Sequence, residues 1–308
     1  MNLFKLRQSA LLFATALIWG CSFVAQSIGM DSVGPFTFTS ARMALGVLVL
    51  LPFVALSRMR LAAADPEKAA ERRTKAYRRT LALGCLACGL CLFGGESLQQ
   101  FGLAAGTSAG KSGFITSLYI VLVPILSLAL GRRPGPLVWG AVAFALAGLW
   151  LLCLPEGSGF SLEAGDLFTL GCAFVFSLHI LVIAHFVGRV NPIELSCGQF
   201  FVGCILGTAA AFLFETPTTE GLRAALLPIL WAGIMSNGIA YTLQIAGQRG
   251  MNETVASLIL SLESVFAALA GWVVLGETLT PRELTGCVLM ACAVVLAELP
   301  APKRRKSA

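Results

Sequence analysis

The sequence predicts an all-α membrane protein in which ten transmembrane helices form two inverted five-helix repeats around a central cavity. Three observations predict this fold: an apolar composition, ten apolar stretches of bilayer-spanning length, and matching features in the two halves of the chain. The 308 residues are 57% hydrophobic and only 12% charged. Soluble domains carry about 25% charged residues because water must solvate their surface. This chain has too little polar surface for a soluble protein, so we place it in a membrane.

Five apolar stretches lie in the first half, each of about 17–25 residues, as a membrane-spanning helix requires. The first follows Lys5 and Arg7 and looks superficially like a signal peptide. Bulky Trp19 occupies the position where cleavage needs a small residue, so we expect an uncleaved span. Glycine and proline separate the other stretches, and only 58–79 is a sizeable loop. The predicted spans are 9–29, 35–57, 81–102, 107–130 and 137–154.

Five further stretches follow in the second half, and tight turns at prolines separate several of them. Pro155 and Asn191-Pro192 come before the sixth and seventh stretches, and Pro217 and Pro281 come before the eighth and tenth. The predicted spans are 164–187, 193–214, 224–247, 254–275 and 283–299.

The distribution of lysine and arginine predicts that both termini are cytoplasmic. With that orientation, 18 of the 22 basic residues lie inside, eight of them in loop 58–79, and only Arg223 and Arg282 lie outside. Cytoplasmic segments of membrane proteins are enriched in basic residues. We therefore expect a multi-pass protein of the cell (inner or plasma) membrane. The net charge of +6 therefore says nothing about nucleic acid, and no nucleic-acid partner is expected. We attribute the basic loop 58–79 to stop-transfer and contact with anionic lipid of the bilayer, the alternative being a partner-binding site.

Related positions recur in the two halves. At an offset of 157, Pro35 corresponds to Pro192; at an offset of 145, Gln99 corresponds to Gln244 and Pro136 to Pro281. We infer two repeats, 1–155 and 156–308. Because five spans is an odd number, the second repeat must insert upside down. Inverted repeats of this kind are typical of secondary transporters, which bind solute at the repeat interface near the bilayer midplane.

Two groups of residues resemble a known family. The opening residues Trp19-Gly20-Cys21-Ser22-Phe23, Gly34-Pro35 and Arg42 resemble the EamA type of the drug/metabolite transporter superfamily. The same is true of Ser261-Leu262-Glu263-Ser264-Val265-Phe266-Ala267-Ala268, Gly276-Glu277-Thr278-Leu279-Thr280 and Gly286. The resemblance covers essentially the whole chain, and it implies ten helices around a cavity, alternating access and no nucleotide-driven motor. It leaves the substrate open.

Proline positions distinguish this chain from the family pattern. The family usually has a proline after Glu263, where this chain has Ser264, and the first half keeps Pro124 further along its span. We therefore expect a kink at Pro124 in the fourth span. For the ninth span, which lacks the proline, we do not predict a bend. The pairs Gly106–Gly110 and Gly203–Gly207 have the GxxxG spacing that lets helices pack closely.

Ionisable residues inside a membrane are candidates for function because charge is costly there. Arg42, Glu96 and Lys111 fall at similar depth, which predicts an ion-paired cluster near the outer mouth. This cluster could line a solute pathway or simply lock helices together. Glu263 lies near mid-membrane with no charged neighbour in sequence. Low dielectric favours the protonated form of such a carboxylate, which makes Glu263 the candidate carrier in a proton-coupled mechanism.

Polar residues at helical spacing indicate helix faces turned towards water or towards another helix. Trp19 belongs to such a stripe with Thr15, Ser22 and Gln26, and Asn237, Tyr241, Gln244 and Gln248 form another. A serine-rich stripe in the ninth span is attributed to contacts between helices. His179 corresponds to Ser22 across the repeat. The candidate solute pathway comprises Trp19, Arg42, Glu96, Gln99, Lys111, Tyr119, His179, Asn237, Tyr241, Gln244 and Glu263.

The sequence indicates a secondary transporter that moves a small metabolite or amino-acid-like solute by alternating access, with export the favoured direction. The alternative is a structural or receptor-like membrane protein without transport activity. An enzyme is not expected, because no nucleophile–base pair or metal-ligand motif lies at depth. Cys85, Cys88 and Cys91 have a metal-like spacing without an accompanying histidine, so neither a metal nor another cofactor is expected.

Overall fold

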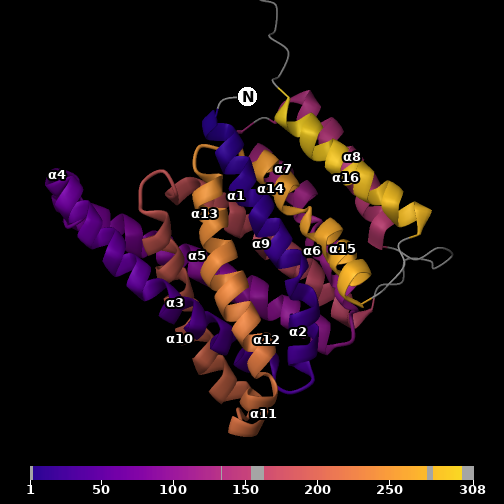
Figure 1. The fold of residues 1–308 in the computed structure, drawn as a ribbon, viewed down its shortest axis with the longest axis horizontal. Helices are drawn as coiled ribbons and strands as arrows, with labels where there is room; N and C mark the ends of the chain where they lie inside the picture. Colours follow the sequence, from indigo (N-terminus) through magenta and orange to yellow (C-terminus); the bar gives the residue numbers. More distant parts are fainter. Residues whose placement is uncertain (1–2, 133, 154–162, 276–279, 300–308) are drawn as a thin grey trace, which may run out of the picture.

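The computed structural model describes residues 3–132, 134–153, 163–275 and 280–299, and these residues form helices and short connections. Arg133, the predicted boundary between residues 155 and 156, the motif Gly276-Glu277-Thr278-Leu279 and the basic residues 303–306 lie outside the described ranges. The helices, labelled in Figure 1 where there is room, are α1 (Leu3–Gly20), α2 (Ser22–Met30), α3 (Pro35–Ala64), α4 (Pro66–Glu71), α5 (Lys75–Ala104), α6 (Ala109–Thr116), α7 (Tyr119–Ala129), α8 (Pro136–Cys153), α9 (Ala164–Phe186), α10 (Pro192–Phe214), α11 (Thr219–Ala224), α12 (Leu226–Leu230), the π-helix η1 (Trp231–Tyr241), α13 (Thr242–Gln248), α14 (Glu253–Leu260), α15 (Glu263–Leu275) and α16 (Pro281–Glu298).

In the described ranges, eight helical segments are long and apolar enough to cross a membrane, so the chain is a multi-pass membrane protein. They are Leu3–Met30, Pro35–Ala64, Lys75–Ala104, Ala109–Ala129, Ala164–Phe186, Pro192–Phe214, Leu226–Gln248 and Glu253–Ala270. Two predicted spans fall outside this set. Pro136–Leu152 is a shorter apolar helix, and the 18 residues of α16 include Arg282, Glu283 and Glu298.

Prolines set the start of many helices. Pro35, Pro66, Pro192 and Pro281 each occupy a first-turn position, and α8 begins at Pro136. The first turn of a helix has no intrahelical partner for its N–H groups, and proline has no N–H to leave unpaired. Pro35, Pro136, Pro192 and Pro281, which separate apolar stretches in the sequence, therefore begin the helices that follow, whereas Pro217 lies just before α11.

Helices from the two halves of the chain pack against one another in pairs. The main contacts join α3 to α10, α5 to α9, and α8 to α16, and the last pair lies side by side in Figure 1. In addition, α1 packs against η1 and α13. Helices α5 and α9 are the third and sixth predicted spans, and their counterparts in the other half are the eighth span, which contains η1 and α13, and the first span, which contains α1. The contact of η1 and α13 with α1 is therefore the counterpart of the α5–α9 contact. The packing is therefore nearly unchanged by swapping the halves.

The loop predicted at 58–79 is largely helical, which corrects the sequence-based prediction. Helix α3 continues to Ala64, α4 follows, and α5 begins at Lys75. The segment is rich in alanine and arginine, which favour helix, although its many arginines make it too polar for a bilayer. Asp65 caps α4 by accepting from the Lys68 backbone N–H at 2.9 Å, and Thr74 caps α5 in the same way.

The fourth and ninth spans are both interrupted, at related positions. Between α6 and α7, the Leu118 N–H donates to the Ile115 carbonyl at 3.1 Å; between α14 and α15, the Leu262 N–H donates to the Ile259 carbonyl at 3.2 Å. These tighter i to i−3 bonds replace the α-helical pattern at both sites. The fourth span is thus interrupted at Ser117-Leu118 and not at Pro124, which lies inside α7, and the ninth is interrupted without a proline.

Only one of the two glycine pairs packs as predicted. A Cβ added at Gly207 would lie 3.2 Å from Ser40 Cα, where α10 crosses α3, and one at Gly203 would collide with Met43. A Cβ at Gly110 would meet no atom within 4 Å, and Gly106 adopts φ of 95° in the turn after α5. Gly106 therefore serves a left-handed turn, which suits glycine, and does not pack against another helix.

Candidate functional site

A small cavity with many polar lining residues lies where the interrupted spans meet α2, α3, α5, α9 and η1. Its volume is about 30 Å³. A single water needs roughly 10–15 Å³ by this measure, so the cavity holds one or two waters and nothing larger. Its lining residues are Trp19, Phe23, Gln26, Arg42, Gln99, Thr116, Tyr119, Phe176, His179, Ile180, Ser236, Tyr241, Gln244 and Glu263.

Arg42 connects four segments at the edge of this cavity. Its guanidinium donates to Glu96 Oε1 at 2.5 Å, to Gln26 Oε1 at 2.8 Å and to Asn237 Oδ1 at 3.2 Å. Arg42 is only 1% exposed and Glu96 is fully buried. A buried charge must be paired and hydrogen-bonded to be tolerated. The planar fork of donors on arginine can meet all three partners, so one side chain joins α3 to α2, α5 and η1.

Glu263 is the acidic residue among those that line the cavity, as Arg42 is the basic one. It is the first residue of α15, at the interruption of the ninth span, and it accepts from Tyr119 Oη at 3.0 Å. Ser117, at the interruption of the fourth span, donates to the same oxygen at 3.4 Å and bonds Ser264 Oγ at 2.9 Å. The two interruptions therefore meet at this carboxylate. The free N–H groups at the start of a helix also favour an acidic side chain there.

An aromatic wall completes the cavity. The rings of Trp19 and Tyr241 lie 4.7 Å apart between centroids, and His179 approaches Tyr241 edge-on at 6.0 Å. His179 Nε2 is 2.9 Å from Gln199 Oε1, so one nitrogen of its ring is occupied. In the part of the chain that the structure describes, Trp19 Nε1 and Gln244 Oε1 have no hydrogen-bond partner although both are buried. The lining thus offers one donor and one acceptor that protein groups do not use.

Eight of the eleven residues proposed from the sequence line the cavity: Trp19, Arg42, Gln99, Tyr119, His179, Tyr241, Gln244 and Glu263. Glu96 and Asn237 lie behind the lining as hydrogen-bond partners of Arg42.

Of the predicted ion-paired cluster of Arg42, Glu96 and Lys111, the Arg42–Glu96 pair forms, but Lys111 has a different partner. Lys111 Nζ instead pairs with Asp166 Oδ2 at 2.6 Å, and Thr107 also donates to Asp166. Helix α6 begins only at Ala109, so Lys111 lies in its first turn, close to the start of α9 where Asp166 lies. Arg42 and Glu96, by contrast, lie within α3 and α5. The depth estimate from sequence placed Lys111 too far inside its span.

Six lining residues were not among the sequence candidates: Phe23, Gln26, Thr116, Phe176, Ile180 and Ser236. Gln26 belongs to the polar stripe of the first span, which was the signal that could have identified it. Ser236 lies in η1, where wider π-helical turns change which residues share a face. Phe176 and Ile180 carry no sequence signal, because an apolar side chain facing a cavity looks the same in sequence as one facing lipid.

Comparisons with known proteins agree on the family. The model of the EamA-like transporter family matches residues 7–154 and 163–299. An uncharacterized transporter from Archaeoglobus fulgidus is 32% identical over 286 residues, covering 92% of this chain and 83% of that protein. The threonine/homoserine exporter RhtA from Escherichia coli K12 is 27% identical, covering 96% of this chain and 92% of that protein.

The fold also matches a solved structure. One crystal structure superposes with a TM-score of 0.73 at 20% identity and covers 94% of this chain and 96% of that one, which shows a shared fold. Since the two family matches together span most of the sequence, the chain belongs to the EamA-like transporter family of the drug/metabolite transporter superfamily, and it is a transporter and not an enzyme.

Proposed function

We propose that this protein is a secondary transporter that exports a small, amino-acid-like solute across the cell membrane by alternating access. The observation that carries the proposal is a small cavity lined by one cation, Arg42, and one carboxylate, Glu263, together with hydrogen-bonding and aromatic groups. An amino acid is a zwitterion, so its carboxylate complements Arg42 and its ammonium complements Glu263. A relative that exports threonine and homoserine supports this solute class.

The proposed architecture has ten spans, with residues 1–155 and 156–308 as two inverted repeats and both termini in the cytoplasm. Helices α8 and α16 then serve as the fifth and tenth spans. The near-symmetric packing of the halves and the matching interruptions at Leu118 and Leu262 support a duplicated unit. The unequal distribution of lysine and arginine supports the orientation.

In this proposal the structure represents the occluded state of the transport cycle. A cavity of about 30 Å³ cannot hold an amino acid, so the halves must separate at one end to admit it. At one end, Glu215 accepts from the backbone N–H groups of Phe36 and Thr37, both at 2.8 Å. At the other, Glu194 accepts from Arg58 at 2.7 Å and Tyr77 at 2.8 Å. We assign these two clusters as the outer and inner gates.

The substrate proposal is tested by loading cells that overexpress the protein with labelled threonine, homoserine or an uncharged solute of similar size, and measuring efflux. We expect faster efflux of the zwitterions than of the uncharged solute, and loss of that efflux in Arg42→Ala. Efflux of the uncharged solute alone, with Arg42→Ala unaffected, would refute the zwitterion assignment. Thiol labelling of single cysteines introduced at Arg60 and Arg223 tests whether these sites lie on opposite sides of the membrane.

A further inference from the structure

A second and larger hollow lies away from the central cavity, at the end of the bundle where α4 is found. Its volume is about 670 Å³, within the usual range of ligand-binding pockets. Helix α4 and the adjoining ends of α3 and α5 form its walls, and α10 forms its floor. These three helices project from the bundle in Figure 1. We call this hollow the arginine groove.

The groove is strongly basic. Arg58, Arg72, Arg73 and Arg78 all line it, and among the described lining residues Glu194 is the only acidic one. The Glu194 carboxylate is already held by Arg58 and Tyr77, so it does not neutralise the other three arginines. The acidic residues of α4, Glu67 and Glu71, are exposed and do not line the groove. The positive charge of these three arginines therefore favours binding of an anion.

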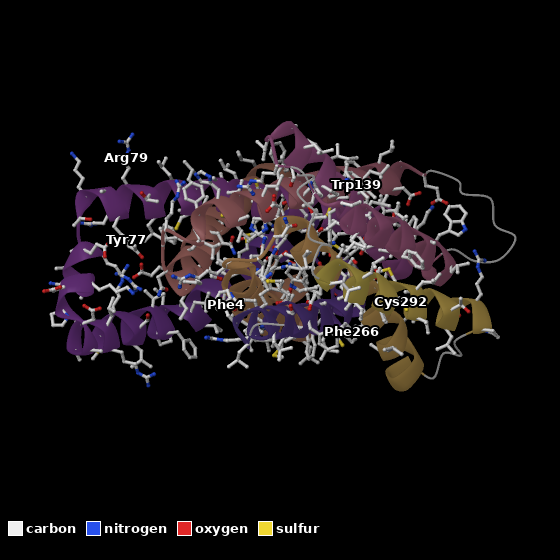
Figure 2. The ribbon with its side chains drawn as sticks, turned by 90° about the horizontal axis from the view of Figure 1, so that it is seen from above. Phe4, Tyr77, Arg79, Trp139, Phe266 and Cys292 are labelled. Carbon is white, nitrogen blue, oxygen red and sulfur yellow. The ribbon has the colours of Figure 1, made fainter. Side chains whose placement is uncertain are left out.

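Arg72 provides a second, independent observation. In the described part of the chain, its Nη1 atom is buried and has no hydrogen-bond partner. A buried guanidinium N–H without an acceptor is costly, and arginine is well suited to bind phosphate through two parallel hydrogen bonds. Figure 2 shows Tyr77 directed inwards between these helices, whereas the neighbouring Arg79 points away from them. The groove thus has a defined inner face, and Arg79 does not line it.

The remaining lining is apolar and continuous with the lipid-facing surface. Leu61, Leu81 and Val202 line the groove together with Phe201, which is 58% exposed. Ile205, one turn further along α10, is 54% exposed. Helix α3 has 30 residues and is therefore about 45 Å long, whereas the hydrocarbon core of a bilayer is about 30 Å thick. Helix α3 is therefore long enough to carry its last turns beyond the hydrocarbon core, which would place the arginines among lipid headgroups and Phe201 towards the acyl chains.

We propose that the arginine groove binds one anionic phospholipid, with its phosphate held by Arg72 and Arg78 and an acyl chain lying along Phe201. A small soluble anion would leave the apolar lining unused. The residues at the C-terminus of this chain, Lys303 to Lys306, have the same sign as the groove and do not complement it. This site is separate from the proposed solute cavity, so it does not depend on what the protein transports.

The test measures lipid binding to the purified full-length protein in detergent by native mass spectrometry, with dioleoyl phosphatidylglycerol, dioleoyl phosphatidylcholine and inorganic phosphate as probes. The groove variant is Arg72→Gln with Arg78→Gln. The matched control is Arg60→Gln with Arg79→Gln, which removes the same charge from exposed positions of α3 and α5 that do not line the groove. We expect phosphatidylglycerol to bind roughly tenfold more weakly to the groove variant and within about twofold of wild type to the control.

Three results would overturn the proposal: equal losses in the two double variants, equal affinity for phosphatidylcholine, or full competition by inorganic phosphate. The first would show diffuse attraction to negative charge, and the last a site for a soluble anion. If the groove variant does not fold, photolabelling of the wild-type protein tests the proposal instead. A phosphatidylglycerol with a photoreactive acyl chain should label peptides that contain Phe201, and labelling confined to other helices would contradict the proposed pose.

Discussion

At the scale of single residues, two carboxylates show how burial and partners set different roles. Glu96 and Glu263 are both nearly inaccessible to solvent, at 0% and 4% exposure. Glu96 lies against the guanidinium of Arg42, whereas Glu263 is held by the hydroxyls of Tyr119 and Ser117. An ion pair fixes the charge of its carboxylate, whereas hydroxyl partners are compatible with either protonation state. We therefore propose a structural role for Glu96 and a proton-linked role for Glu263.

Replacing Glu263 by glutamine should uncouple transport from protons. The amide keeps the size of the side chain and can still accept from Tyr119, but it cannot exchange a proton. In proteoliposomes we expect solute-dependent proton flux to fall to background in Glu263→Gln, measured with a pH-sensitive dye. Tyr119→Phe serves as the control, since it removes one hydrogen bond and leaves the carboxylate in place. Normal proton flux in Glu263→Gln would remove this residue as the carrier.

Replacing Glu96 should instead reduce stability. Glu96→Leu leaves Arg42 buried without its counter-charge, which costs about 3–5 kcal/mol. The double variant Arg42→Met with Glu96→Leu should lose less, because no uncompensated charge remains. Thermal unfolding of the purified variants gives the comparison. If the double variant were as unstable as the sum of the two single variants, the ion pair would have no coupling of its own.

At the scale of elements, the interrupted and widened helices decide where polar groups meet. The breaks at Ser117-Leu118 and Ser261-Leu262 bring Ser117, Glu263 and Ser264 together. The π-helix η1 places Asn237 on Arg42 and Ser236 in the cavity lining. Irregular backbone at membrane depth is tolerated only where it lies inside protein or lines a cavity. These features therefore belong to the candidate site and not to the lipid-facing surface.

The α3–α10 contact can be tested at Gly207. A Cβ there would lie 3.2 Å from Ser40 Cα, so Gly207→Ala must push the two helices apart. Overpacking of this kind costs typically 1–3 kcal/mol. Gly110→Ala is the matched control, because its Cβ would meet no atom within 4 Å. We expect a lower melting temperature for Gly207→Ala only; equal melting temperatures would mean that this crossing has room to spare.

At the scale of the whole molecule, the proposed cycle requires each end of the bundle to open in turn. In that proposal the contact between Glu215 and the start of α3 closes one end, and the Glu194 cluster closes the other. Because both contacts are present together, the structure corresponds to the occluded state of the proposed cycle. Alternating access predicts that holding either end shut stops transport without unfolding the protein.

A cross-link at the Glu215 end should therefore block efflux. Cysteines at Thr37 and Glu215, introduced after replacement of the native cysteines, would be joined by a short bifunctional thiol reagent that reductant cleaves. We expect efflux to fall to background on cross-linking and to recover on cleavage, while each single-cysteine variant is unaffected by the reagent. Undiminished efflux by the cross-linked protein would exclude this contact as a gate.

Much of the candidate site could be predicted from residue chemistry and spacing. Arg42 and Glu263 were identifiable because charge inside an apolar stretch is costly, and Trp19 and Tyr241 because they belong to polar stripes at helical spacing. Lys111 was misplaced because an error of a few residues in the start of α6 changes its depth and its partner. Phe176 and Ile180 could not be identified, since an apolar residue gives no sign of which neighbour it faces.

The sequence by itself determined that the chain is helical, that it crosses the membrane many times and that related features recur in its two halves. Those properties follow from local quantities: hydropathy, the position of prolines and the distribution of charge along the chain. Only the tertiary structure decided that Arg42 also bonds Gln26 and Asn237, that Lys111 bonds Asp166, and that the interruptions of α6–α7 and α14–α15 meet at Glu263. Such pairings depend on which helix faces touch, and that is set by packing between segments far apart in sequence.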